Sequence, residues 1–130
     1  MGVYTFHKEE RLKSEKTIGQ LFKTGASFGQ YPLRLVFLAE EKGQGVYPVK
    51  ITFSVPKKKF PKAVQRNRLK RLMREAWRLN KNRLYREMKE HTPGYAFMVL
   101  YTGSEAASFA VIEKNMRNMI RRFLIQEKIV

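Results

Sequence analysis

The sequence predicts an α+β fold in which helices and strands follow the order α-β-β-β-α-β-α. Residues 49–55 alternate between apolar and polar, and residues 95–102 are apolar on both faces, which indicates strands. Apolar residues at helical spacing over 62–81, and again after Ser108, indicate two helices. The 130 residues contain no repeat or linker, so we expect a single domain over residues 1–130.

The N-terminal half supplies one helix and the first strands. Residues 1–10 carry no capping signal or apolar pattern, and we expect them to form a loosely held arm. Ser14 is a suitable N-cap for a helix that Gly25 ends. Residues 33–40 are strand-like, and the glycines and proline that follow predict a turn into strand 49–55.

A basic loop precedes the longest predicted helix. Pro56 and Pro61 exclude helical structure from the segment between them, and a helix over 62–81 follows. The polar segment Asn80–Asn82 weakens this helix, so we expect a second helical stretch that runs to about Glu90.

The C-terminal third contains a strand and a helix. Strand 95–102 has no polar face, so it should lie in the centre of its sheet. Ser104 or Ser108 can cap the last helix. The apolar face of that helix should lie in the core and consists of Ile112, Met116, Met119, Ile120 and Phe123.

The chain is strongly basic. Its 27 Lys and Arg residues outnumber 11 acidic residues, for a formal net charge of +16. Such a field attracts polyanions, of which nucleic acid is the commonest. The absence of cysteine excludes disulfides and thiolate metal sites. No apolar run reaches membrane-spanning length and no signal-peptide core is present, so we expect a cytoplasmic protein.

Most of this charge follows residue 56. Residues 57–90 contain fourteen Lys and Arg against three Glu, a difference of +11. Helix 62–81 places its apolar side chains on an arc of roughly 160° and its basic ones on a neighbouring arc of roughly 140°. A solvated face would alternate acids with bases at i,i+4, so we interpret the basic arc as a nucleic-acid surface. The apolar arc is Leu69, Leu72, Met73, Ala76, Trp77 and Leu79, and the basic arc is Arg66, Asn67, Lys70, Arg71, Arg74 and Arg78.

The sequence does not predict a protein active site. A two-metal nuclease needs clustered carboxylates, but the chain has no Asp. Its adjacent pairs Glu9–Glu10 and Glu40–Glu41 are expected only to add solubility. His7 and His91 stand alone, and no phosphate-binding glycine loop is present. We therefore predict no catalytic and no metal-ligating side chain.

The aromatic residues divide into two groups. Trp77 lies on the apolar arc and is expected in the core. Phe22, Phe28 and Tyr31 stay open between a core position and a binding cleft, because aromatic side chains serve both roles.

Several segments resemble a known family. "AVQRNRLKRLMREAW" resembles the RNR signature of the protein subunit of bacterial ribonuclease P. "RLKSEKTIGQLFKTGAS" resembles the first helix and the following turn of that family, and "ITFSVPKKKFPKAVQRNR" resembles its strand, basic loop and helix entry. Strand 95–101 and the last helix follow in the same order, so the resemblance covers roughly residues 11–125.

This resemblance implies an RNA-binding subunit that, together with a catalytic RNA, removes the 5′ leader of precursor tRNA and raises substrate affinity by binding the leader. The RNA supplies the active site and binds most of the Mg²⁺, so the protein belongs to an endoribonuclease without contributing catalytic side chains. The implied partners are ribonuclease P RNA and precursor tRNA, with no membrane and no stable protein partner. The implied fold is an α/β sandwich with a mixed four-stranded sheet and a left-handed crossover, against the usual hand.

The resemblance also assigns binding residues. Those facing the RNA subunit are Arg66, Asn67, Arg68, Lys70, Arg71 and Arg74 of the helix and Lys57, Lys58 and Lys59 of the loop. Those of the leader cleft, between the first helix and the open sheet face, are Ile18, Phe22 and Lys23. Ile18 stands where the family usually has Phe, and Val36 lies near a position that is often aromatic. Both departures reduce the stacking surface, which is worth about 1–3 kcal/mol per base.

Two other classes fit parts of the sequence. A small basic ribosomal or RNA-assembly protein would have the same charge and size, and only the ordered motifs distinguish it. A DNA-binding helix-turn-helix protein would need a short helix before residue 62, where a strand and a proline-bracketed loop are predicted.

Overall fold

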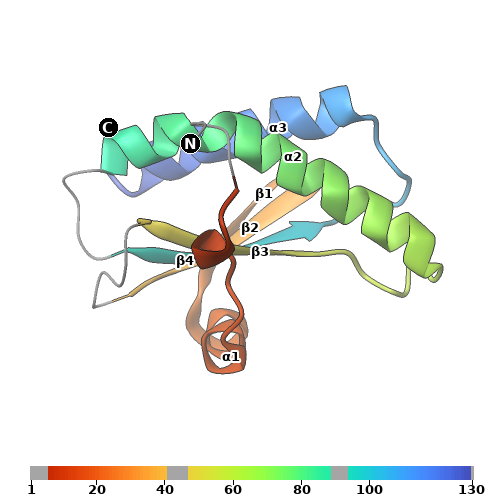
Figure 1. Cartoon of the computed structure of the whole chain (residues 1–130), viewed down its shortest axis with the longest axis horizontal. Coiled ribbons are helices and arrows are strands. Elements are labelled where there is room, and N and C mark those ends of the chain that lie inside the picture. The colour runs from red at the N-terminus through yellow and green to blue at the C-terminus, as the bar shows by residue number, and fades with distance from the viewer. Residues whose placement is uncertain (1–5, 41–46, 89–93, 130) are drawn as a thin grey trace.

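The computed structural model describes residues 6–40, 47–88 and 94–129, which form a four-stranded sheet with helices on both faces (Figure 1). The predicted order of helices and strands is confirmed, with a short 3-10 helix added at the start. The elements are η1 (Lys8–Glu10), α1 (Glu15–Thr24), β1 (Ala26–Gln30), β2 (Leu33–Ala39), β3 (Val49–Ser54), α2 (Ala63–Met88), β4 (Tyr95–Tyr101) and α3 (Phe109–Gln126).

The sheet is mixed, with the strand order β1-β2-β4-β3. Strand β4 pairs antiparallel with β2 and parallel with β3, so its predicted central position is confirmed. Helix α2 connects the parallel neighbours β3 and β4, as the family resemblance implies. The edge strand β1 was counted in the predicted order, but no sequence pattern had placed it.

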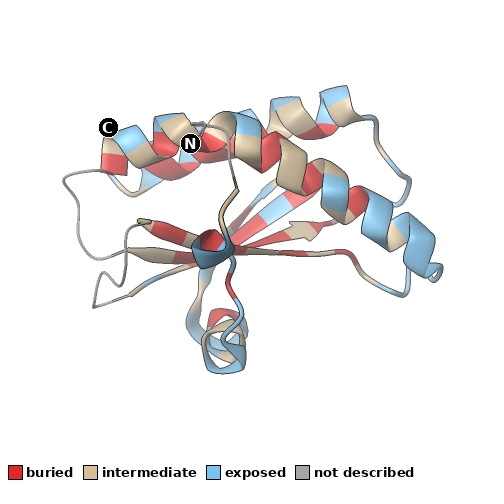
Figure 2. Cartoon of the chain, viewed as in Figure 1, coloured by how far each residue is buried: buried red, intermediate tan, exposed pale blue. Residues whose placement is uncertain are grey.

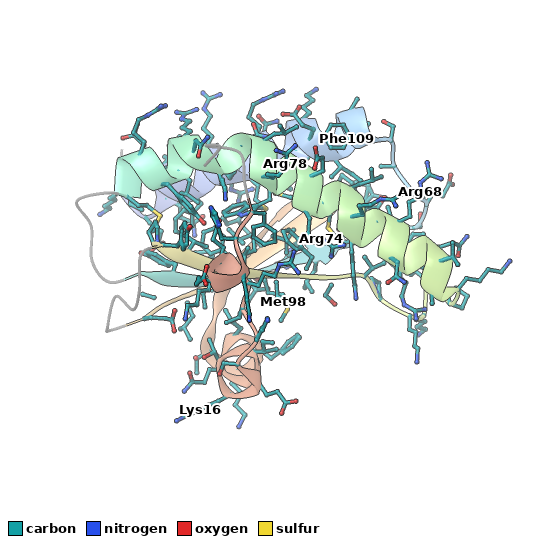
Figure 3. The ribbon with its side chains drawn as sticks, in the orientation of Figure 1. Lys16, Arg68, Arg74, Arg78, Met98 and Phe109 are labelled. Carbon is teal, nitrogen blue, oxygen red and sulfur yellow. The ribbon has the colours of Figure 1, made fainter. Side chains whose placement is uncertain are left out.

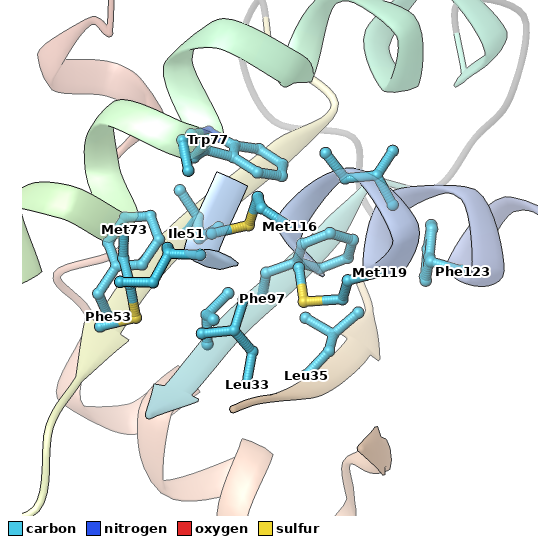
Figure 4. Packing of buried hydrophobic residues seen from close by; sticks show 14 of the residues in the cluster. Leu33, Leu35, Ile51, Phe53, Met73, Trp77, Phe97, Met116, Met119 and Phe123 are labelled. Carbon is cyan, nitrogen blue, oxygen red and sulfur yellow. The ribbon is translucent and has the colours of Figure 1, made fainter. Parts of the chain in front are cut away.

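The main core lies between the sheet and the helices α2 and α3 (Figure 4). Trp77 is fully buried, and its ring meets that of Phe97 edge to face at 5.9 Å. Phe97 meets Phe123 in the same way at 4.8 Å. Met116 and Met119 are also fully buried, so the core positions predicted for Trp77 and for both methionines are confirmed.

The predicted break at Asn80–Asn82 is wrong, because α2 is one continuous helix through these residues. The Asn80 amide donates to the Ala76 carbonyl at 2.8 Å and to Glu113 of α3 at 2.9 Å, so tertiary contacts hold the polar residue in the helix. Leu84 and Met88 continue the buried side beyond it.

Residues 6–10 are anchored, although a loose arm was expected over residues 1–10. Glu10 is fully buried and forms an ion pair with Lys81 of α2 at 2.6 Å. The expectation that Glu9 and Glu10 only add solubility is therefore wrong for Glu10 but fits Glu9, which is exposed. Residues 1–5, together with Glu41 and His91, lie outside the described residues.

In the described part of the chain, α1 is the only helix on the other face of the sheet, where it lies against β2 and β4 (Figures 1 and 2). Ser14 caps it as predicted by accepting from the Thr17 amide at 3.2 Å. The helix ends before Gly25, where a Cβ atom would come within 2.5 Å of the Leu21 carbonyl oxygen. A second, smaller core forms under α1 from Leu12, Leu21, Val36, Ala96 and Met98.

Candidate RNA-binding surface

The first turns of α2 carry cations where a helix usually carries acids. No acidic residue lies in the first turn of α2. Since the N-terminal end of a helix is already the positive end of its dipole, cations there are unfavourable unless an anion binds against them. Asn67 and Arg68 are exposed near this end, and Arg71 is exposed one turn further on. Figure 3 shows Arg68 directed away from the sheet.

The other cations of the predicted arc have more specific surroundings. Lys70 and Arg74 are half-buried on the side of α2 that faces β3. Arg78 pairs with Glu75 at 2.6 Å, and this hydrogen bond lowers the pKa of Glu75. Arg78 is therefore partly neutralised, whereas Arg71 has no carboxylate within salt-bridge distance among the residues that the structure describes.

Arg66 holds the basic loop against the helix. Its Nη1 donates to the carbonyls of Phe60 and Pro61, both at 2.8 Å. One nitrogen makes both bonds, so the other donors of the guanidinium fork can still bind a phosphate. Arg66 therefore has a structural role that its position in the signature did not indicate.

The basic loop is fixed by its buried end. Phe60 is buried, packs edge to face on Tyr101 at 5.6 Å, and closes the turn through its amide, which donates to the Pro56 carbonyl at 3.1 Å. The predicted cations Lys57, Lys58 and Lys59 are all exposed beside this anchor. The Lys59 amine donates to the Thr102 carbonyl at 3.0 Å, which places the loop next to the end of β4.

The predicted leader residues lie on α1. Phe22 is 67% exposed, which excludes the core position that had been its alternative, and Lys23 beside it is exposed as well. Ile18 is half-buried against the small core that contains Val36. Of the other two open aromatics, Phe28 is buried and Tyr31 is 66% exposed.

Two functional candidates had no signal in the sequence analysis. Arg11 and Lys13 are exposed and line the same pocket as Lys70 and Arg74. They lie before α1 and carry no helical or strand period, so only the folded chain shows that they join the other cations. We call the whole set the basic surface: Arg11 and Lys13, Lys57, Lys58 and Lys59 of the loop, and Arg66, Arg68, Lys70, Arg71 and Arg74 of α2.

The acidic residues that the structure describes do not gather into a metal site. Within the described ranges, no group of three or more His, Asp or Glu residues could hold a metal ion. Proteins usually bind Mg²⁺ through one or two carboxylates, and the basic surface contributes none, so its residues do not fit this ion. In the part of the chain that is described, no helix is both long and apolar enough to cross a membrane.

The fold and the basic surface define a nucleic-acid-binding α+β domain. Comparison with known proteins narrows this class, because the ribonuclease P family model matches residues 6–124. The chain is 36% identical to the ribonuclease P protein component of Porphyromonas gingivalis strain ATCC 33277, over 93% of this chain and 88% of that protein. It is 34% identical to that of Chlorobium phaeobacteroides, over 98% and 93% of the two chains.

Solved structures agree on the fold. The Staphylococcus aureus RNase P protein superposes with a TM-score of 0.66 at 18% identity, over 88% of this chain and 94% of that one. The Thermotoga maritima RNase P protein, solved with 1-(4-fluorophenyl)-2-thiourea, gives 0.65 at 25% identity, over 86% and 98%.

The chain therefore belongs to the ribonuclease P protein family, as the resemblance of its motifs indicated. It is the RNA-binding protein component of a ribonucleoprotein that processes the 5′ end of tRNA. This membership decides against the ribosomal, RNA-assembly and helix-turn-helix alternatives.

Proposed function

We propose that the chain binds its ribonuclease P RNA through the basic loop and the exposed side of α2. The observation that carries this proposal is the run of cations Lys57, Lys58, Arg68 and Arg71, which are exposed and have no carboxylate partner within the described ranges. Arginine forks grip pairs of phosphate oxygens and stack on bases, and Asn67 among them can bond a base edge or a 2′-hydroxyl.

The second part of the proposal is that α1 and the open sheet face bind the 5′ leader of precursor tRNA. Phe22 offers an exposed ring for one base, and Lys23 next to it offers a cation for the backbone. Ile18 adds apolar contact only. Leader binding by these residues would raise the affinity for precursor tRNA over mature tRNA, which has no leader.

In this proposal the RNA subunit catalyses the cleavage. Mg²⁺ would be bound chiefly by the RNA subunit, and the protein would lower the amount needed by bringing positive charge to a crowded polyanion. This work would take place in the cytoplasm, where tRNA precursors are made and processed in bacteria.

Reconstitution tests the proposal. A bacterial ribonuclease P RNA transcript should cleave precursor tRNA at lower Mg²⁺ and lower salt when the protein is added. The matched control is a variant with Lys57, Lys58, Arg68 and Arg71 all changed to Ala, which removes only exposed side chains. That variant should fold but lose most of the effect. A wild-type protein that leaves both requirements unchanged would contradict the proposal.

A further inference from the structure

The segment from Phe6 to Lys13 forms one wall of the basic surface. In Figure 1 it passes from the side of α2, across the edge of the sheet, to α1. The edge is that of β3, and the Leu12 amide donates to the Ile51 carbonyl there at 2.9 Å. The side chain of Leu12 is buried in the small core under α1.

Glu10 fastens this segment to α2. Both of its carboxylate oxygens lie 2.6 Å from the Lys81 amine, and the Tyr85 hydroxyl donates to one of them at 2.6 Å. The His7 amide donates to the other oxygen at 2.9 Å. Burial and the bond to Glu10 raise the pKa of Tyr85, so its hydroxyl stays a donor at any ordinary pH. The carboxylate thus has partners both on α2 and within the N-terminal segment.

The fastened segment brings two cations next to two cations of α2. Arg11 and Lys13 from the segment and Lys70 and Arg74 from α2 line a pocket of about 250 Å³. No acidic side chain lines it, and within the described ranges none of the four has a carboxylate at salt-bridge distance. Figure 3 shows Arg74 on the side of α2 toward the sheet.

These like charges are costly without an anion. Burial, and then the positive charges of Arg11 and Arg71, lower the pKa of Arg74. Arg11 is oriented by the Phe6 ring, whose centroid lies 5.1 Å from the guanidinium carbon. A phosphate group in the pocket would relieve the repulsion and could accept hydrogen bonds from all four side chains.

We propose that Glu10 is a positioning residue, which holds Arg11 and Lys13 against α2 so that these four cations bind a backbone phosphate of RNA. The inference rests on the proposed function, because it takes the anion from an RNA chain. A buried ion pair contributes little net stability, and in some proteins it instead fixes one arrangement of the groups around it. Here that arrangement is the one that completes the pocket.

The test measures how affinity for a ribonuclease P RNA transcript depends on salt. Arg11→Ala should reduce the slope of log affinity against log salt by about 0.7–0.9, the value of one phosphate contact. Glu10→Gln should reduce it at least as much, and the double variant Glu10→Gln/Arg11→Ala should lose no more than Glu10→Gln alone. Glu9→Gln removes an exposed neighbouring charge and should leave the slope unchanged. A general loss of folded protein would lower the affinity without changing the slope.

Docking of the segment is followed separately by hydrogen exchange at the Leu12 amide, which should speed up in Glu10→Gln and not in Glu9→Gln. If Glu10→Gln does not fold, Tyr85→Phe replaces it, since this change removes one bond to Glu10 and keeps the ion pair. A folded Glu10→Gln protein whose slope is unchanged with both the RNA transcript and precursor tRNA, or slope losses that add in the double variant, would overturn the inference.

Two further arms locate the phosphate and separate this inference from the proposed function. A slope change with the RNA transcript alone supports the pocket and places the phosphate on the RNA subunit, whereas a change only with precursor tRNA, and not with mature tRNA, supports it and places the phosphate on the leader. Arg71→Ala is the reference. If it changes the slope and Arg11→Ala changes neither the slope with the transcript nor that with precursor tRNA, only the inference fails. If neither does, the proposed function fails too.

Discussion

Phe22 and Phe28 are six residues apart and have opposite surroundings. Phe22 on α1 is 67% exposed, whereas Phe28 on β1 is 4% exposed and packs under α3, with the Arg122 guanidinium 4.5 Å above its ring. The sequence left both open because each lies on a short element whose buried side depends on distant partners. The exposed ring is the one available to a base.

Phe22→Ala should weaken binding of precursor tRNA to the assembled enzyme by about 1–3 kcal/mol, the cost of losing one stacked base. Binding of mature tRNA should stay nearly unchanged. The free energy of unfolding should also stay nearly unchanged, because so much of the ring is already in water. Affinities for the two tRNAs, measured on the same preparation, check this.

The control for this prediction is Phe28→Ala, which truncates a buried ring of the same size. It should lower the free energy of unfolding by about 3–5 kcal/mol and affect both tRNAs alike through loss of folded protein. A Phe22→Ala protein that behaves like this control would remove Phe22 from the leader site.

Arg66 and Arg71 differ in a way that their shared motif hides. Arg71→Ala removes an exposed side chain and should reduce the salt slope of RNA binding by about 0.7–0.9. Arg66→Ala should weaken binding more, because it also releases the carbonyls of Phe60 and Pro61 and so loosens the basic loop. Lys16→Ala on α1, an equal change of charge on the opposite side of the molecule (Figure 3), should leave the slope for the RNA subunit unchanged. Equal losses for Arg66→Ala and Arg71→Ala would contradict the structural role of Arg66.

At the scale of elements, local periodicity predicted α2 but not the N-terminal segment that packs against it. The apolar arc of the helix is a property of its own sequence, and four of its members, Leu69, Met73, Ala76 and Trp77, are buried as expected. Lys81 is buried because Glu10, 71 residues earlier, lies against it. A pattern within one helix carries no information about such a distant partner. The sequence therefore predicted neither the anchored N-terminal segment nor the unbroken helix at Asn80, which is bonded to Glu113 of α3.

Lys81→Met should destabilise the protein by about 3–5 kcal/mol, because it leaves the Glu10 carboxylate buried without its counter-charge. The double variant Glu10→Met/Lys81→Met should recover most of this loss, since it replaces the buried pair with apolar side chains. Urea unfolding of the two variants and the wild type gives the comparison. A double variant no more stable than Lys81→Met would show that the pair contributes packing that methionine does not replace.

Tyr95 ties β4 to the end of α3 and makes stability depend on alkaline pH. Burial, and then the hydrogen bond that its hydroxyl donates to Glu127 at 2.9 Å, raise the pKa of Tyr95 to about 12. In the unfolded chain the pKa of tyrosine is about 10. The folded state therefore holds this proton more tightly, and stability falls as the pH rises from about 10 to about 12.

Tyr95→Phe should make that fall shallower, as measured by urea unfolding at intervals from about pH 9 to about pH 12. Part of the fall should remain, because burial also raises the pKa values of Tyr85 and Tyr101. An identical pH dependence in Tyr95→Phe and wild type would remove Tyr95 from this account.

At the scale of the whole molecule, the two faces of the sheet are covered differently. Among the described residues, α2 and α3 close one face over a continuous core, and α1 is the only helix on the other (Figures 1 and 2). Local patterns predicted the order of the long helices and of β2, β3 and β4, but they did not place β1. The pairing β1-β2-β4-β3 was not, because strand pairing joins segments far apart in the chain, and the mixed sheet came from the family resemblance alone. The left hand of the crossover stays a prediction.

Some acidic residues of this chain are engaged in contacts within the fold. All eleven acidic residues are Glu. Several of them hold the fold: Glu10 binds Lys81, Glu75 binds Arg78, Glu113 binds Arg117 and Asn80, and Glu127 binds Tyr95. A carboxylate committed to a cation or a hydroxyl of the same chain is a poor ligand for a second charge.

Purified protein should therefore not cleave precursor tRNA at any Mg²⁺ concentration, because phosphodiester cleavage by a protein needs metal-binding or proton-transferring groups at one site. Adding the ribonuclease P RNA to the same preparation should produce leader removal, with a rate that falls as salt weakens the assembly. The protein is treated beforehand with a nuclease that is then inactivated, so that no carried-over RNA contributes. Leader removal by this RNA-free protein would overturn the assignment of catalysis to the RNA. If no leader is removed after the RNA is added, the proposed binding of RNA by the basic surface is contradicted instead.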